Sequence, residues 1–186
     1  MNHVDHVALI RDGVAGAGPR WLELGAGDGT FTLALAEVLG ASASIVAMDR
    51  DRDALGRLSG RLAQRSPAAA VETRTGDFTS GLPDGPFDGV LAANSLHFVR
   101  DTRPVLAAIR AILVPEGRLV LVEYDAERGN QWVPYPISFA RWKMLAPAAG
   151  FTPPVRLHRV HSRFLDAIYG ASTTASPTPP GSAAQG

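Results

Sequence analysis

The sequence predicts an α/β protein of three layers, in which helices cover both faces of a doubly wound, mostly parallel sheet. Short apolar runs alternate along the chain with longer segments whose large apolar residues recur at helical spacing. The apolar runs are nearly continuous, which indicates strands that are buried on both faces. The 186 residues, 46% of them hydrophobic, suffice for one sizeable core and therefore for one domain.

The first half of the chain alternates between helices and strands. Helices are predicted over residues 2–13, 30–39 and 53–66, and strands over residues 20–24, 44–48 and 70–74. The second helix is apolar on most faces and stops at Gly40, as a buried helix does. Leu55, Leu58 and Leu62 give the third helix one apolar stripe.

The second half changes character towards its end. A strand over 87–93, a helix over 103–114, a turn at 115–117, a strand over 118–124 and a helix over 138–149 continue the alternation. Two extended segments, 155–160 and 164–169, are joined tightly at His161 and Ser162, which predicts a C-terminal antiparallel hairpin. We place a single domain at 1–170. We expect a disordered tail at 171–186, where Ala, Ser, Thr, Pro and Gly dominate.

Composition excludes several classes of protein. The chain has no cysteine, so disulfides, thiolate zinc sites and a cysteine nucleophile are ruled out. No apolar run is long enough to span a membrane and the N-terminus lacks a secretory pattern, which predicts a cytoplasmic protein. Six basic residues lie between 128 and 164 with no acidic residue among them. They indicate a solvated surface or a rim that attracts an anionic substrate, and they are too few for a nucleic-acid groove.

The first predicted strand leads into a glycine-rich turn, Glu23-Leu24-Gly25-Ala26-Gly27-Asp28-Gly29. Parallel sheets bind ligands at this edge, beyond the carboxyl ends of their strands. Glycine permits positive φ and lets a ligand lie against bare backbone, and the next helix offers its N-terminal N–H groups. The dinucleotide fingerprint G-x-G-x-x-G fails here because its sixth position is Thr30.

The turn resembles motif I of the class I methyltransferases that use S-adenosylmethionine (SAM), and the resemblance extends over roughly residues 20–170. Three later features follow in the family's order. The second strand ends at Asp49, the third leads to Asp77 and Phe78, and residues 87–98 and 113–119 look like the family's fourth and fifth strands. Pro-Glu-Gly replaces the usual Pro-Gly-Gly at 115–117. The resemblance implies a seven-stranded sheet of order 3-2-1-4-5-7-6.

The resemblance also implies the residues that bind SAM. Asp49, rather than Asp51 or Asp53, would accept hydrogen bonds from the ribose diol. Asp77 would take the adenine amino group, with Phe78 against the ring. Glu23 would either bond the amino group of the methionine part or hold the glycine loop as a structural acceptor. The full cofactor-binding set implied is Glu23, Gly25, Ala26, Gly27, Gly29, Asp49, Arg50, Asp77, Phe78 and Asn94.

The expected reaction is methyl transfer from SAM to a small-molecule acceptor by in-line displacement at carbon, which leaves S-adenosylhomocysteine. The leaving group is neutral, so a base is needed only where the acceptor starts protonated. His97 follows the fourth strand and is the candidate catalytic base, with helix packing as the alternative. Tyr124, Trp132 and Tyr135 are candidate substrate contacts, and the loop around Trp132 would form a pocket wall or plug the end of the sheet.

Several alternatives stay open at this stage. His3 and His6 are one helical turn apart, but they lack a third ligand, so we expect no metal site. The N/D-Pro-Pro-Tyr signature of methylation on base amino groups is absent. The acceptor site would be open or completed by a partner chain in a homo-oligomer. A non-catalytic SAM-binding regulatory or assembly module is the rival function, and a nucleotide-binding oxidoreductase a distant third.

Overall fold

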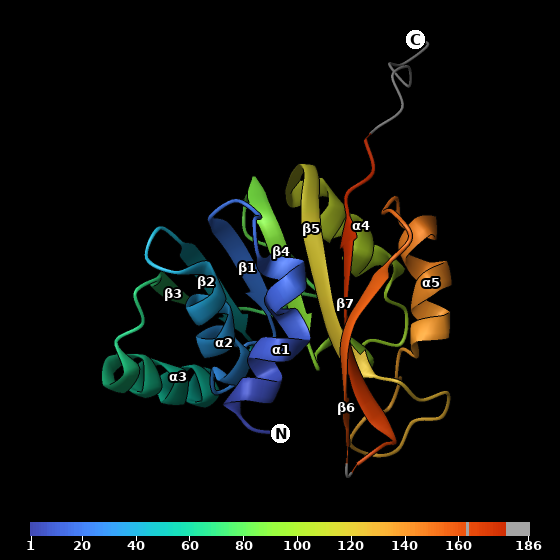
Figure 1. Ribbon diagram of the computed structural model, residues 1–186, viewed down its shortest axis with the longest axis horizontal. Helices are drawn as coiled ribbons and strands as arrows, with labels where there is room; N and C mark the ends of the chain where they lie inside the picture. The colour runs from blue at the N-terminus through green and yellow to red at the C-terminus, as the bar shows by residue number, and fades with distance from the viewer. Residues whose placement is uncertain (163, 178–186) are drawn as a thin grey trace.

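A computed structural model describes residues 1–162 and 164–177 and confirms the predicted architecture (Figure 1). Its strands form one seven-stranded sheet in the order β3-β2-β1-β4-β5-β7-β6. The first five strands pair in parallel, whereas β7 pairs antiparallel with both β5 and β6. The strands are β1 (Arg20–Leu24), β2 (Ser44–Asp49), β3 (Ala70–Thr75), β4 (Phe87–Ala93), β5 (Leu113–Tyr124), β6 (Val155–His161) and β7 (Ala167–Thr174).

Helices cover both faces of this sheet. On one face α1 and α2 pack against side chains such as Trp21 and Val120, and α3 packs on Ala47. On the other face α4 and α5 pack against Leu22 and Leu121. None of the described helices is long and apolar enough to cross a membrane. The helices are α1 (His3–Val14), α2 (Thr30–Leu39), α3 (Arg52–Arg65), η1 (Leu96–Phe98), α4 (Arg103–Ile112) and α5 (Phe139–Ala148).

Local sequence explains where the helices near the glycine turn begin. The Asp51 side chain accepts the backbone N–H groups of Asp53 and Ala54 at 2.9 and 3.1 Å, which caps the N-terminus of α3. Asp51, the competitor of Asp49 for the ribose, is therefore occupied as a helix cap. A Cβ on Gly170 would collide with the Leu9 carbonyl oxygen, so α1 lies directly against the backbone of β7.

The C-terminal boundary expected at residue 170 is wrong. β7 continues to Thr174, and Ala175 forms a further bridge with Phe151. Ala171 and Thr173 are buried, because β7 lies inside the sheet between β5 and β6, where small residues fit between the packed layers. Composition alone does not distinguish such a strand from a low-complexity tail. Residues 178–186 of the expected tail lie outside the described residues.

Other segments differ from expectation in detail. The turn expected at 115–117 lies within β5, where Glu116 adopts a φ of 60° and the pairing with β4 shifts register between Phe87 and Gly89. The second arm of the hairpin begins at Ala167 instead of residue 164. Because β1 to β4 are parallel, the segments that follow them meet at one edge of the sheet, the lower edge in Figure 1.

Candidate functional site

The glycine turn folds as the sequence predicts. Gly25, Gly27 and Gly29 all have positive φ, at 73°, 55° and 86°. The backbone N–H groups of Gly25 and Ala26 both donate to the Met48 carbonyl, at 2.9 and 3.0 Å, which fixes the turn to the end of β2. A Cβ on Gly27 would enter open space with no atom within 4 Å, so the backbone there is accessible to a ligand. The turn therefore presents bare backbone at the ligand edge of the sheet.

A cleft of about 600 Å³ opens beside this turn. That volume falls in the usual range of small-molecule sites. Six residues of the predicted cofactor set line it, whereas Glu23, Ala26, Gly27 and Gly29 do not. The sequence missed several others, including Ser95, Val99 and Arg100. The lining residues are Gly25, Asp49, Arg50, Asp51, Gly76, Asp77, Phe78, Thr79, Asn94, Ser95, Phe98, Val99 and Arg100.

Asp49 connects the two loops at the head of the cleft. Its Oδ2 accepts the Gly27 N–H at 2.8 Å and its Oδ1 accepts the Asp51 N–H at 2.9 Å. Each carboxylate oxygen has a second lone pair. The side chain therefore fixes the glycine turn and the start of α3 while it keeps acceptor capacity towards the cleft. The sequence predicted Asp49 as a hydrogen-bond acceptor for the ribose, but it did not predict the hydrogen bonds from these two loops to Asp49.

Asp77 and Phe78 line the same cleft after β3. The Asp77 Oδ1 accepts the Thr79 hydroxyl at 2.7 Å and the Thr79 N–H at 2.8 Å. These hydrogen bonds lower the pKa of the Asp77 carboxyl, so the group is ionised at neutral pH. The Phe78 ring comes within 3.8 Å of the position that a Cβ on Gly25 would take. An anionic acceptor and an aromatic ring thus follow one another in the chain where β3 leads into the cleft.

Two buried polar atoms test whether a ligand such as SAM fits the cleft. Among the described residues, the Asn94 Oδ1 and the Ser95 Oγ are buried and accept no hydrogen bond within the protein. Asn94 has a φ of 52° and its N–H donates to the Val122 carbonyl at 2.8 Å, which holds it at the end of β4. Buried acceptors favour a ligand that brings hydrogen-bond donors. SAM offers its ribose hydroxyls and its ammonium group, so the residues present fit it.

Glu23 is fully buried at the end of β1, and its Oε2 accepts the Thr32 hydroxyl at 2.5 Å. Burial raises the pKa of the Glu23 carboxyl to about 8, and the neighbouring Asp49 carboxylate adds to this, while the Thr32 bond opposes it. The group is thus mostly protonated at neutral pH. The sequence left two roles open for Glu23, a bond to the amino group of the cofactor or a structural contact. The structure shows a contact of the second kind, because Glu23 accepts a hydrogen bond from the first turn of α2.

Replacing Glu23 with glutamine is expected to flatten the pH dependence of stability. The unfolded carboxyl ionises near its ordinary pKa of 4.5, whereas the folded one keeps its proton to about pH 8. Unfolding between these values releases a proton, so the free energy of unfolding falls as pH rises, by about 3–5 kcal/mol in total. Urea denaturation from pH 5 to 9 should show this decline in the wild type and not in E23Q. An exposed control, E72Q, should follow the wild type; parallel profiles for all three proteins would contradict the assignment.

A second buried acid, Glu123, pairs with the candidate base. The Glu123 Oε2 lies 2.8 Å from the His97 Nδ1, and its Oε1 accepts the His97 backbone N–H at 3.1 Å. Both side chains are almost wholly buried, at 3% and 0% exposure. Glu123 is in β5 and His97 in η1, next to residues that line the cleft. The sequence identified the histidine and missed the glutamate.

Aromatic residues surround this pair. The His97 ring lies 4.3 Å from the Phe98 ring and 5.7 Å, edge-on, from the Tyr124 ring. The Tyr135 N–H donates to the His97 carbonyl at 3.0 Å, which anchors the loop after β5 beside η1. In that loop Val133 and Ile137 are buried, whereas Trp132 and Tyr135 stay 66% and 39% exposed. The loop therefore both covers the core and presents two aromatic rings outwards.

The basic residues after Arg128 are partly neutralised. Asp125 lies 3.4 Å from Arg156 and 3.9 Å from Arg159, and its Oδ1 also accepts the Phe139 N–H at 2.9 Å. Arg159 also lies 3.5 Å from Asp166. Asp125 therefore joins β5 to the start of α5 and to β6.

The fold places a cleft at the ligand edge of a doubly wound sheet, and comparison with known proteins defines the family. A family model described as a methyltransferase domain matches residues 22–119, more than half of the chain, so the protein belongs to this family. It is a class I SAM-dependent methyltransferase and therefore an enzyme. This membership supports SAM as the cofactor and lends nothing to the non-catalytic module or the oxidoreductase.

Individual relatives agree with this assignment. A reducing polyketide synthase of a Penicillium species is 29% identical over 160 residues, covering 72% of this chain and 6% of the synthase. An uncharacterized methyltransferase of Mycobacterium bovis is 28% identical over 161 residues, covering 81% of this chain and 78% of the relative. The crystal structure of the YcgJ protein from Bacillus subtilis superposes with a TM-score of 0.73 at 15% identity, covering 95% of this chain and all of that one, and so supports the fold.

Proposed function

We propose that the protein methylates a small molecule that must lose a proton as it reacts, either an enolisable carbon acid or a phenol. The observation that carries the proposal is the buried His97–Glu123 pair beside the cleft. A neutral amine already has a lone pair and needs no base, so a buried base pair would be superfluous for it. A carbon acid or a phenol does need one.

The residues of the pair have distinct parts in this proposal. An ionised carboxylate only accepts hydrogen bonds, so Glu123 holds the proton of His97 on Nδ1 and leaves the lone pair on Nε2. That nitrogen takes the acceptor's proton, and Glu123 stabilises the imidazolium that results. SAM, when bound, supplies an electrophilic methyl group on a positively charged sulfur. The acceptor's electron pair forms the new bond to that methyl carbon.

Other residues would position the reactants. Asp49 and Asp77 offer acceptors to the ribose and the adenine, and Asn94 and Ser95 offer buried oxygens between them and His97. Phe98 and Tyr124 pack against the His97 ring, and Trp132 and Tyr135 are exposed in the loop after β5. These side chains would contact an apolar or planar acceptor. Orientation of two reactants contributes about 7–11 kcal/mol in favourable cases.

Transfer from labelled SAM to a small set of acceptors tests the proposal. One relative is named a polyketide synthase, which makes a 1,3-dicarbonyl compound a rational first probe, next to a phenol, a primary amine and a thiol. We expect label in the dicarbonyl or the phenol, and little or none in the amine or the thiol. Transfer to the amine alone, with a rate unaffected by replacing His97, would overturn the proposal.

A further inference from the structure

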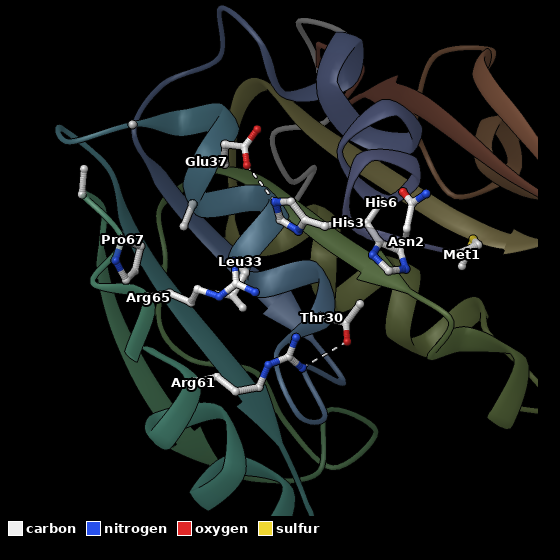
Figure 2. A pocket seen from close by; sticks show the side chains of 13 residues that line it. Met1, Asn2, His3, His6, Thr30, Leu33, Glu37, Arg61, Arg65 and Pro67 are labelled. Carbon is white, nitrogen blue, oxygen red and sulfur yellow. Dashed lines mark hydrogen bonds and ion pairs between the residues drawn. The ribbon is translucent and has the colours of Figure 1, made fainter. Parts of the chain in front are cut away.

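A second cavity, of about 440 Å³, lies away from the cofactor cleft. It is a groove between the N-terminal part of α1, the outer side of α2 and the end of α3 (Figure 2). Its described lining shares no residue with the cleft. The lining residues are Met1, Asn2, His3, His6, Thr30, Leu33, Ala36, Glu37, Gly40, Arg61, Arg65, Pro67 and Ala68.

Basic side chains line this groove on two sides. Arg61 and Arg65 extend from α3 towards α2, and His3 and His6 face them from α1 (Figure 2). Glu37 is the one acidic residue in the described lining, and it is already engaged by His3 at 2.7 Å and by Arg11 at 3.8 Å.

The two arginines differ in their partners. Arg61 lies 3.0 Å from the Asp28 carboxylate and donates to the Asp28 carbonyl at 3.0 Å and to the Thr30 hydroxyl at 3.3 Å. Arg65 makes no ion pair or hydrogen bond with its side chain in residues 1–162 and 164–177. The last turn of α3 therefore offers an available guanidinium to the groove.

The His6 side chain is half-buried on the α1 side of the groove. Its ring packs edge-on against Phe31 at 4.9 Å. Burial lowers the pKa of His6, and the N-terminal amine, His3 and Arg61 lower it further, against an opposing effect of Asp5. The same positive surroundings that disfavour a proton on His6 favour an anion in the groove.

Part of the groove beyond these basic side chains is apolar. Leu33 and Ala36 form its floor on α2, and Pro67 and Ala68 form its far end after α3. A bare inorganic anion would leave these surfaces unused. A ligand that combines an anionic group with a small apolar body matches both parts, as small-molecule sites generally combine apolar walls with a few charged groups.

We propose that this groove is a second ligand site that binds a small organic anion, its phosphate or carboxylate near Arg65 and His6 and its apolar part on Leu33 and Ala36. The site is distinct from the methyl-transfer site. It is connected to that site through Arg61, which bonds to Asp28 and Thr30 on either side of Gly29. The Arg61 side chain therefore lies between the groove and the glycine turn.

Calorimetric titration of the full chain with phenyl phosphate tests this proposal without SAM or an acceptor. We expect saturable binding, at least tenfold weaker binding in R65Q, and unchanged binding in R57Q, which removes an exposed arginine of the same helix outside the groove. Inorganic phosphate should bind more weakly than phenyl phosphate, and benzyl alcohol should not bind. R65Q alters an exposed side chain at the end of α3, and an unchanged melting temperature would show that it folds.

Two outcomes would overturn the proposal. Equal affinity in R65Q and the wild type would show that the anion binds elsewhere, and equal affinity for benzyl alcohol would show that charge plays no part. Repeating the titration with the cleft saturated by S-adenosylhomocysteine distinguishes this site from the cofactor cleft, because binding in the groove should persist and binding in the cleft should be lost. The result is independent of the His97 experiments, so failure here and failure of the proposed function are separately visible.

Discussion

Replacing His97 with asparagine is expected to lower turnover by about 10²–10⁴-fold while SAM still binds. Asparagine places an amide N–H where the His97 Nδ1 donates to Glu123, so the buried carboxylate keeps a donor and only the basic Nε2 is lost. Alanine is the less informative change. It would leave the buried Glu123 carboxylate with backbone N–H donors alone, and removing one side chain of a buried pair typically destabilises a fold by about 3–5 kcal/mol. The measurement is single-turnover methyl transfer at saturating SAM, with calorimetry of S-adenosylhomocysteine as the check on the cofactor site.

Glu123→Gln provides the companion variant. A glutamine can present its NH₂ group to the His97 Nδ1, which would place the histidine proton on Nε2 and remove the lone pair that faces the acceptor. Turnover should therefore fall although both side chains remain in place, and the acceptor KM should change little. A folded H97N or E123Q protein with wild-type turnover would show that the pair is structural and that His97 only packs η1 against β5.

The glycine turn and its acidic partners could be predicted because each depends on local pattern. The turn must follow a buried strand, Asp49 ends the next strand in the chain, and Asp77 follows the strand after that by two residues. Parallel topology then brings these ends to one edge without any knowledge of side-chain packing. The strand order was implied by the resemblance to the methyltransferase family alone, and the structure confirms it.

Glu123 could not be predicted in this way, because its role depends on pairing between strands. Ala93 is opposite Val122 in the β4–β5 ladder, and this register places His97 over Glu123. One signal was present in the sequence, since Glu123 is a single acid that follows Leu119, Val120, Leu121 and Val122. A carboxyl group is expensive to bury without a partner, so an acid in an apolar strand indicates a partner nearby. The partner's identity still needed the fold.

Replacing Asp49 with alanine is expected to weaken the binding of S-adenosylhomocysteine about 100-fold or more. Its carboxylate already accepts N–H groups from Gly27 and Asp51, so the variant loses the support of the turn together with the acceptors for the ribose. Hydrogen bonds to a charged group contribute about 1.5–3 kcal/mol each, and about 1.4 kcal/mol corresponds to a factor of ten in affinity. Asp53→Asn, at an exposed position in the first turn of α3, is the matched control and should bind as the wild type does.

The lost support of the turn and the lost ribose contact can be measured separately when the ligand is changed as well as the protein. If Asp49 binds the ribose diol, the wild type should prefer S-adenosylhomocysteine over its 2′-deoxy analogue, and D49A should lose that preference. If Asp49 only holds the Gly27 and Asp51 amides, the substitution should weaken both ligands by the same factor, which would contradict the predicted ribose contact. The double comparison isolates the pairwise contribution because the support of the turn is lost equally for both ligands. It also shows whether one carboxylate can serve the loops and the cofactor together, as its remaining lone pairs allow.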